Sequence, residues 1–312
     1  MKKILVTGIE GFVGSHLAQH LSAAGYHVVG LHHAAPTTPL SAELHQGDIC
    51  NLEQTQSLVE RIQPDAVIHL AGITSVAASE TNALRTYEVN ALGTVKLLEA
   101  IRQLSLATRV LLISSADVYG RSNVGKPLTE NQPLQPLSPY ALSKVMAEEA
   151  GWFYHRAYQM DVVILRPFSH TGPGQLPTFV FPKVACGIAS AEAGRQQPLI
   201  EMGDLEIRRD YTDVRDIVRA YSLALEKCVS GEVYNVTSGQ PVLLKEAVEY
   251  LCSLARCPIT VRPSPKEFRS RDIPLLTGDP SKFAAVTGWK PEIPFQQTLS
   301  DLLEYYRNRC SV

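Results

Sequence analysis

Tyr140 and Lys144 stand four residues apart in the stretch SPYALSK, and Ser115 precedes them in the stretch ISSADVYG. Residues four apart on a helix share one face, so we expect the phenol and the ammonium group to lie together. A free tyrosine has a pKa of about 10, and a neighbouring ammonium group lowers it by favouring the phenolate. A serine hydroxyl beside them can hydrogen-bond a carbonyl oxygen. The three side chains therefore predict acid–base chemistry on a carbonyl group, and the alternative is an amphipathic helix with a surface lysine.

A glycine-rich turn, in the stretch TGIEGFVGSHL, is the second feature that could serve a reaction. It follows a short apolar run and opens a helical pattern, so the chain there passes from a strand to a helix. Glycine lets the backbone approach a ligand closely, and a helix N-terminus favours the negative charge of a pyrophosphate. The turn predicts a dinucleotide site, and the alternative is a tight turn that packs a helix closely on a strand. The residues of the turn that we expect to bind the cofactor are Gly8, Gly11, Phe12, Val13 and Gly14.

The end of the second predicted strand, residues 26–31, bears on which dinucleotide is bound. In NAD-binding proteins an Asp or Glu there holds the 2′-hydroxyl of the adenosine ribose. Here the strand is followed by His32 and His33, and the missing carboxylate removes a repulsion against a 2′-phosphate. This favours NADP(H) slightly over NAD(H), with His32 near the phosphate; the alternative is that both histidines face solvent and either cofactor is used. Asp48, which Ile49 follows, could accept a hydrogen bond from the adenine amino group.

The composition argues against several function classes. The 312 residues carry a formal net charge of −2, which gives no argument for nucleic acid or an anionic membrane as a partner. No apolar run reaches the roughly 18 residues of a membrane span, and the N-terminus lacks the layout of a signal peptide. We therefore expect a cytoplasmic location. Neither the six cysteines nor the nine histidines show a metal-ligand spacing, so we expect free thiols and no metal.

The elements that must position these residues alternate between strands and helices. Strands are predicted at 3–7, 26–31, 66–70, 109–114 and 161–166, and helices near 14–24, 51–62, 84–104 and 140–158. The strands are nearly continuous in Val, Ile and Leu, which is typical of a parallel sheet buried on both faces. The alternation predicts an α/β protein with a doubly wound parallel Rossmann sheet.

The chain changes character after residue 170, where a segment rich in Pro and Gly begins. Helical patterns recur near 179–193, 213–229, 244–255 and 296–309. We expect residues 1–170, with a strand at 231–239 that returns to them, to form the dinucleotide-binding domain. Residues 171–230 and 240–312 would form a smaller α/β C-terminal part that binds the substrate.

Together the motifs resemble the extended short-chain dehydrogenase/reductases, over essentially the whole chain. The matching stretches are TGIEGFVGSHL, GDI, HLAG, NALGT, SSADVYG, YALSK, RPF and RDYTDVRD. By this resemblance Ser115, Tyr140 and Lys144 are the catalytic set, and Tyr140 and Lys144 also contact the cofactor. The other residues to which the resemblance gives a place are Leu70, Ala71 and Gly72 lining the cofactor, Asn90 supporting the active-site end of its helix, and Pro167 near the nicotinamide.

A few positions separate the members of this family. The nucleotide-sugar 4,6-dehydratases carry an Asp that helps to expel water where this chain has Ala116, so dehydration is disfavoured. The 4-epimerases keep an acid after the second strand, which is absent here. The stretch RPFSHTGPGQ looks most like the GDP-4-keto-6-deoxymannose reductases, although they have Asn where this chain has Ser169. Because a serine is shorter, Ser169 can hold a sugar hydroxyl only if that hydroxyl is closer or bridged by water.

Cations that could hold a nucleotide diphosphate gather in the second part of the chain. By the resemblance, Arg209 and Arg271 approach the diphosphate or its ribose, and Lys183 approaches the base or the phosphates; the alternative for such cations is pairing with nearby aspartates. The full set of residues expected to bind the substrate is Ser115, Ala116, Ser169, His170, Lys183, Arg209 and Arg271.

The function expected from the resemblance is the NAD(P)H-dependent reduction of GDP-4-keto-6-deoxy-D-mannose to GDP-D-rhamnose. One alternative is a nucleotide-sugar 4-epimerase that retains NAD, and a less favoured one is a non-catalytic dinucleotide-binding sensor. The helices predicted at 84–104 and 140–158 could pair across a homodimer, as the resemblance implies, or face only their own sheet. No motif encodes the stereochemistry at C4.

Overall fold

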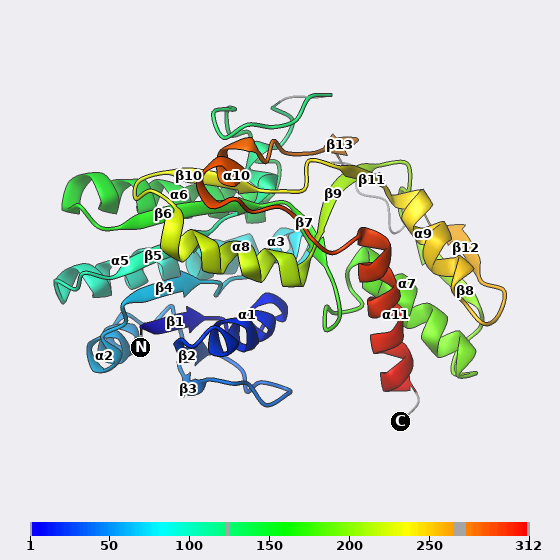
Figure 1. The fold of residues 1–312 in the computed structure, drawn as a ribbon, viewed down its shortest axis with the longest axis horizontal. Helices are drawn as coiled ribbons and strands as arrows, with labels where there is room; N and C mark the ends of the chain where they lie inside the picture. Colours follow the sequence, from blue (N-terminus) through cyan, green and yellow to red (C-terminus); the bar gives the residue numbers. More distant parts are fainter. Residues whose placement is uncertain (1, 123–124, 265–272, 311–312) are drawn as a thin grey trace.

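A parallel sheet between two layers of helices forms the larger part of the molecule, and a smaller α/β part adjoins the end at which the strands finish (Figure 1). The computed structural model describes residues 2–122, 125–264 and 273–310. The strands of the sheet are β1 (Lys3–Thr7), β2 (His27–His32), β3 (Glu43–Gln46), β4 (Ala66–His69), β5 (Arg109–Ile113), β6 (Val162–Pro167) and β10 (Val233–Val236).

The strand order of this sheet is β10-β6-β5-β4-β1-β2-β3, with parallel pairing throughout. The chain leaves β1 toward β2 and β3 and then returns to β4 on the other side of β1. Such a reversal opens a crevice at the carboxyl ends of the strands, where α/β proteins bind their ligands. The predicted doubly wound parallel sheet is therefore confirmed.

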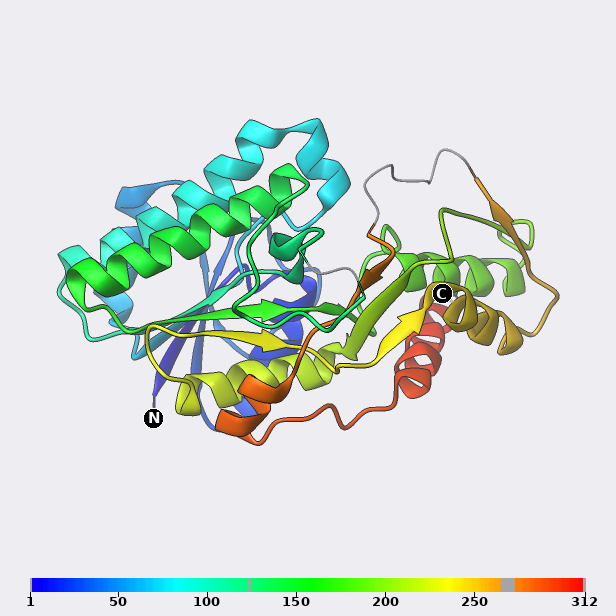
Figure 2. The same cartoon turned by 90° about the horizontal axis from the view of Figure 1, so that it is seen from above.

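Helices cover both faces of the sheet because neighbouring strand residues point to opposite sides. In β1, Ile4 packs on the side of α1 (Phe12–Ala23), α8 (Val214–Lys227) and α10 (Ser281–Thr287), whereas Leu5 packs on the other side. The other side is covered by α2 (Leu52–Ile62), α5 (Gly93–Gln103) and α6 (Pro139–Tyr158). Figure 2 shows α5 and α6 lying side by side over the sheet.

The smaller part has a core of its own. It is formed by α7 (Val180–Glu192), α9 (Leu244–Ser253), α11 (Phe295–Cys310) and the parallel pair β8 (Leu199–Met202) and β12 (Thr260–Pro263). A short second sheet lies between the two parts. In it β9 (Arg208–Asp213) pairs with β7 (Ser169–Thr171), β11 (Pro241–Leu243) and β13 (Leu275–Leu276).

Two helices from the segments expected to bind substrate pack on the large sheet. Helix α8 packs against α1, and α10 packs against β10. Their residues Ile217 and Phe283 are fully buried in the core that α1 shares with the sheet. The chain therefore passes between the two parts several times after residue 170.

The helix predicted at 84–104 is interrupted in the structure. It consists of α4 (Ala83–Tyr87), a wider π-turn η1 (Glu88–Leu92) and α5, and it follows a short helix α3 (Val76–Thr81). Within η1, Asn90 is buried. None of the helices in the described ranges is long and apolar enough to cross a membrane.

Candidate active site

The glycine turn brings bare backbone to the carboxyl end of β1. Gly8 has a φ of +70°, and a Cβ there would lie 2.8 Å from the backbone of Ala71. A Cβ on Gly14 would lie 2.5 Å from the carbonyl oxygen of Gly8, so the start of α1 can pack on the turn only as glycine. Gly11 precedes the first residue of α1 and has no side chain that could occupy the free N–H groups there. These features fit the pyrophosphate of a dinucleotide, because a helix N-terminus with open backbone donors binds phosphate oxygens.

Helix α6 carries the predicted tyrosine and lysine into the interior. Ser138 caps the helix by accepting a hydrogen bond from the backbone N–H of Ala141 at 3.1 Å. Tyr140 and Lys144, one turn apart on one face of the helix, are both buried. The Lys144 ammonium group donates a hydrogen bond to the carbonyl oxygen of Ile113, at the end of β5, at 2.8 Å.

Ser115 lies beside Tyr140, as the sequence predicts. The Ser115 hydroxyl is close enough to the Tyr140 phenol to favour its ionised form as a hydrogen-bond donor. The Ser115 hydroxyl also accepts a hydrogen bond from the backbone N–H of Asp117 at 3.2 Å, which caps the short helix η2 (Ala116–Tyr119). Since this cap fixes the serine rotamer, Ser115 and Tyr140 present two hydroxyl groups to the same point of the crevice.

Burial decides the charge state of the tyrosine and the lysine. Burial raises the pKa of Tyr140 above its usual range, the negative charge of Asp117 raises it further, and only the Ser115 hydrogen bond opposes them. Burial lowers the pKa of Lys144 to about 8, against the opposing effect of the Glu148 carboxylate. The predicted lowering of the Tyr140 pKa is therefore wrong for this structure, because desolvation and the Asp117 charge outweigh the Ser115 hydrogen bond. The tyrosine remains a protonated phenol, which suits a proton donor.

A chain of buried hydrogen bonds holds the strand ends to α6. The Asn90 amide donates to Ser143 on α6 at 2.9 Å, and it binds both backbone groups of Ile73 at 2.8 and 2.9 Å. His69, at the end of β4, bridges Thr7 and Thr94, at 2.7 and 3.0 Å. Burial and the charge of Lys144 lower the pKa of His69 to about 3, so this bridge is a neutral imidazole. Asn90 thus supports the crevice from behind and does not line it.

A buried ion pair stands on the far side of Lys144, and the sequence reasoning missed it. Glu148 lies one helical turn beyond Lys144 and receives two hydrogen bonds from Arg166 on β6, at 2.9 and 2.6 Å. Ser114 donates a further hydrogen bond to the same carboxylate. An arginine inside an otherwise apolar strand was the signal that could have revealed the pair, since a buried charge requires a partner.

The crevice is a cavity of about 1420 Å³ between the two parts. It is lined by most of the residues predicted for cofactor and substrate, namely Gly8, Gly11, Phe12, Val13, Gly14, Asp48, Ile49, Leu70, Ala71, Gly72, Ser115, Ala116, Tyr140, Lys144, Pro167, Ser169, His170 and Arg209. The described residues that line it do not include His32, Asn90 or Lys183. Arg271 lies outside the described residues.

The segment that begins at Ser169 closes one end of the cavity against the glycine turn. The His170 ring stacks on Phe12, with ring centroids 6.3 Å apart and planes at 12°. His16 of α1 hydrogen-bonds the carbonyl oxygen of Pro173 at 2.8 Å. Arg209 of β9 reaches the same cavity and donates a hydrogen bond to the carbonyl oxygen of Ile273. Residues of the predicted substrate part therefore face the predicted cofactor turn directly.

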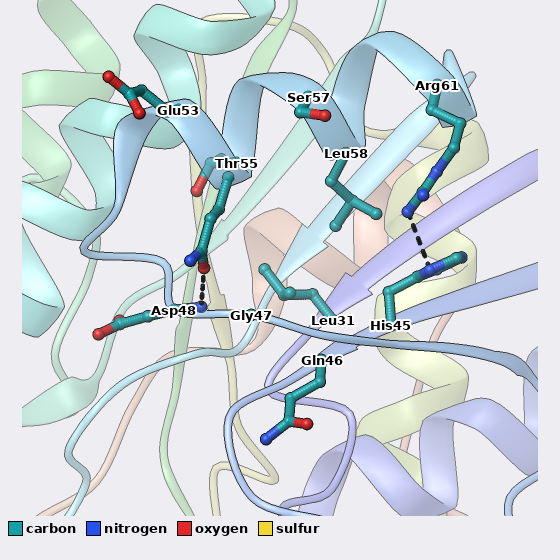
Figure 3. Close-up of a pocket in the computed structure, with 11 residues that line it drawn as sticks. Leu31, His45, Gln46, Gly47, Asp48, Glu53, Thr55, Ser57, Leu58 and Arg61 are labelled. Atoms are coloured by element: carbon teal, nitrogen blue, oxygen red, sulfur yellow. Dashed lines mark hydrogen bonds between the residues drawn. The ribbon is translucent and has the colours of Figure 1, made fainter.

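The turn that carries Asp48 separates this cavity from a smaller one of about 510 Å³ (Figure 3). The backbone N–H of Asp48 donates to the side chain of Gln54 at 3.2 Å, and on the far side of the small cavity Arg61 hydrogen-bonds His45 at 3.0 Å. These contacts hold the 46–48 turn against α2. Asp48 itself faces the large cavity as well, as predicted for a residue near the adenine.

Comparisons with known proteins agree with this geometry. The chain matches the GDP-mannose 4,6 dehydratase family over residues 5–302. It is 35% identical over 309 residues to a GDP-6-deoxy-D-mannose reductase of Pseudomonas aeruginosa, covering 99% of this chain and 98% of that protein. It is 30% identical over 309 residues to a GDP-6-deoxy-D-talose 4-dehydrogenase of Aggregatibacter actinomycetemcomitans, covering 98% of each. The solved structure of RMD from Pseudomonas aeruginosa complexed with NADPH has a TM-score of 0.89 at 34% identity, covering 99% of this chain and 100% of that one.

Proposed function

The chain belongs to the GDP-mannose 4,6 dehydratase family, and we propose that it reduces the C4 keto group of a GDP-linked 6-deoxy-4-keto-hexose with NAD(P)H. The substrate that we favour is GDP-4-keto-6-deoxy-D-mannose, and the product is GDP-D-rhamnose. The similarity to a GDP-6-deoxy-D-mannose reductase along nearly the whole chain supports this choice, since rhamnose is 6-deoxymannose.

The observation that carries the proposal is the composition of the cavity wall around Tyr140. Ser115, Tyr140 and Lys144 converge there, as the reduction of a carbonyl group requires. Ala116 lies in the same wall and offers no proton. The nucleotide-sugar 4,6-dehydratases carry an acid at this position. The wall is therefore equipped to protonate an alkoxide, and its position 116 lacks the acid that in the dehydratases helps water to leave.

The reaction adds one hydride and one proton across the C4 carbonyl group. NAD(P)H, when bound, supplies the hydride. Ser115 and Tyr140 donate hydrogen bonds to the carbonyl oxygen and orient it, and Tyr140 passes its proton to that oxygen as the C–H bond forms. Lys144 stabilises the tyrosinate that remains until solvent restores the proton. The raised pKa of Tyr140 keeps the phenol protonated before each turnover.

The remaining lining residues bind the two ligands. We place the pyrophosphate at the glycine turn, the adenine near Asp48 and Ile49, and the nicotinamide near Pro167. Arg209, Ser169 and His170 face the sugar nucleotide, and an Arg fork suits its phosphate oxygens.

The direct test supplies purified protein with GDP-4-keto-6-deoxy-D-mannose and either NADPH or NADH. We expect one molecule of coenzyme to be oxidised for each sugar nucleotide reduced, and proton NMR to identify the product as GDP-D-rhamnose. GDP-mannose, which has no keto group, serves as the control and should remain unchanged. If the product is instead the C4 epimer, GDP-6-deoxy-D-talose, the reaction is still a C4 reduction but with the opposite stereochemistry. One relative is named for this sugar nucleotide. Oxidation of neither coenzyme would overturn the proposal. Interconversion of sugars by protein that retains NAD would identify an epimerase instead.

We further propose that the protein is a cytoplasmic homodimer. Apolar side chains that the structure describes as exposed gather on α4, η1 and α6, and they are Leu84, Leu92, Leu142, Met146, Phe153 and Tyr158. On α6, Leu142, Met146 and Phe153 are four and seven residues apart and form one stripe, which a second copy of the helix could cover. The six cysteines, all in the described part, are free thiols, as a reducing compartment allows. Light scattering of the wild type and of Met146→Lys tests the dimer.

A further inference from the structure

Glu10 lies inside the glycine turn, and its carboxylate reaches the backbone just beyond β2. One carboxylate oxygen, Oε1, accepts hydrogen bonds from the backbone N–H groups of His33 and Ala34, at 2.8 and 3.4 Å. All three residues line the large cavity. The end of the second strand is where NAD-binding proteins place the acid that holds the adenosine ribose. The sequence after β2 contains no acid at this position. The structure places the Glu10 carboxylate there instead, from the turn between β1 and α1.

The second carboxylate oxygen of Glu10 lacks a donor. Among the described residues, Oε2 is buried and has no hydrogen-bond partner. A buried carboxylate oxygen without a partner costs free energy, so such an atom at a cavity wall indicates a ligand group that can donate to it. The two hydroxyl groups of a ribose are donors of this kind. Glu10 therefore fits the unphosphorylated adenosine ribose of a dinucleotide.

The described residues offer little to neutralise a 2′-phosphate at this end of the cavity. NADP-binding proteins of this fold usually place an arginine there. This chain has no Lys or Arg between Lys3 and Arg61. Arg85 does line the cavity, but its guanidinium group pairs with Glu88 at 2.8 Å and with Asp48 at 3.8 Å. A 2′-phosphate would therefore lie next to the Glu10 carboxylate. The basic residues nearest to the end of β2 in the sequence are His32 and His33.

We propose that Glu10 determines the coenzyme, by holding the adenosine ribose of NADH and repelling the 2′-phosphate of NADPH. The proposal rests on the nicotinamide-dependent function given above and selects between its two coenzymes. It opposes the slight preference for NADP(H) that the residues after β2 favour when they are considered alone.

Equilibrium binding to the protein without sugar substrate tests this directly. The fluorescence of the reduced nicotinamide gives dissociation constants for NADH and NADPH, and competition by 5′-AMP and adenosine 2′,5′-bisphosphate isolates the ribose end. We expect the wild type to bind NADH at least about tenfold more tightly than NADPH, since hydrogen bonds to a charged group contribute to that extent. In Glu10→Gln, NADH binding weakens and NADPH binding strengthens, so the ratio of the two constants falls roughly tenfold or more.

Two carboxylates serve as matched controls. Asp48→Asn alters the adenine end of the same cavity, so we expect it to weaken both coenzymes by a similar factor and to leave their ratio unchanged. Glu53→Gln removes an exposed carboxylate of α2 and changes neither constant. If Glu10→Gln loses stability in a thermal melt, Glu10→Ser provides the same comparison with a small polar side chain.

Two results would overturn the role of Glu10. One is equal or tighter binding of NADPH by the wild type, and the other is a ratio that Glu10→Gln and Glu10→Ser leave unchanged. Failure of the wild type to bind either coenzyme would refute the nicotinamide-dependent function itself. Tight binding of NADH without reduction of the sugar would refute the proposed reaction and leave the role of Glu10 standing.

Discussion

The two walls of the large cavity are built differently. The wall that carries Tyr140, Lys144 and Ser115, here the chemical wall, lies at the ends of buried strands of the large parallel sheet and at the start of a twenty-residue helix. The opposite wall, here the substrate wall, carries Ser169, His170 and Arg209 and is built from β7 and β9 of the second sheet and the segments beside them.

The difference lies in what holds each functional group. On the chemical wall Lys144 is bound to a strand carbonyl, and the Glu148–Arg166 pair behind it is almost completely buried. On the substrate wall, segments far apart in the chain meet, as where Arg209 hydrogen-bonds the carbonyl oxygen of Ile273. We infer that the chemical wall sets the rate of the chemical step through preorganisation, and that the substrate wall sets which sugar nucleotide is bound. Changes on the two walls should therefore affect kcat and KM separately.

The largest expected effect comes from Tyr140→Phe on the chemical wall. The change removes the proton donor and keeps the ring, so kcat should fall roughly a thousandfold or more while the dissociation constant of the coenzyme stays the same. Steady-state kinetics and coenzyme titration measure the two quantities. Tyr305→Phe, at the rim of the same cavity, is the matched control and should keep most of the activity. Turnover of Tyr140→Phe within tenfold of the wild type would contradict the assignment.

The second effect concerns the support behind the chemical wall. Glu148→Gln leaves Arg166 buried without a full counter-charge, which should lower the free energy of unfolding by about 3 kcal/mol in urea denaturation. The exposed pair between Lys282 and Glu232 serves as the control, since Glu232→Gln should cost less than about 1 kcal/mol. Equal losses in the two variants would show that the buried pair contributes no more than a surface pair.

The third effect tests the substrate wall. Arg209→Ala removes a cation that we expect to face the phosphates, so KM for the sugar nucleotide should rise roughly tenfold to a hundredfold. We expect kcat at saturation and coenzyme binding to change little, because the chemical wall is untouched. A fall in kcat with KM unchanged would show that the two walls do not divide the work as we infer.

The effect that is smallest at neutral pH is a pH dependence. With the pKa of Lys144 lowered to about 8, the ammonium group loses its proton above that pH, whereas the raised pKa of Tyr140 keeps the phenol protonated. The value of kcat/KM for reduction should therefore be level below pH 8 and fall about tenfold per unit above it. Initial rates at saturating coenzyme measure the profile. A profile that stays level to pH 10 would exclude Lys144 as the titrating group.

Prediction from the sequence succeeded where the signal was local. The strands around β1, β4, β5 and β6, the capped start of α6 and the glycine turn each follow from neighbouring residues, and all are present at the predicted places. It was less complete after residue 170, where β7, β11 and β13 are only two or three residues long and β9 has the charged sequence RRDYTD. Such strands contain no apolar run that would predict them, since partners from distant segments hold them in place.

The sequence by itself determined that a glycine turn, a serine and a Tyr-Lys pair meet at the end of a parallel sheet, because local patterns and strand order lead there. Only the tertiary structure decided the sign of the Tyr140 pKa shift, since desolvation depends on everything packed around the phenol. It also decided which residue stands beside the end of β2, because Glu10 reaches His33 across 23 positions of chain and no local pattern pairs these two residues. The sequence motifs thus name the reaction, and packing between distant segments sets the charges that its ligands meet.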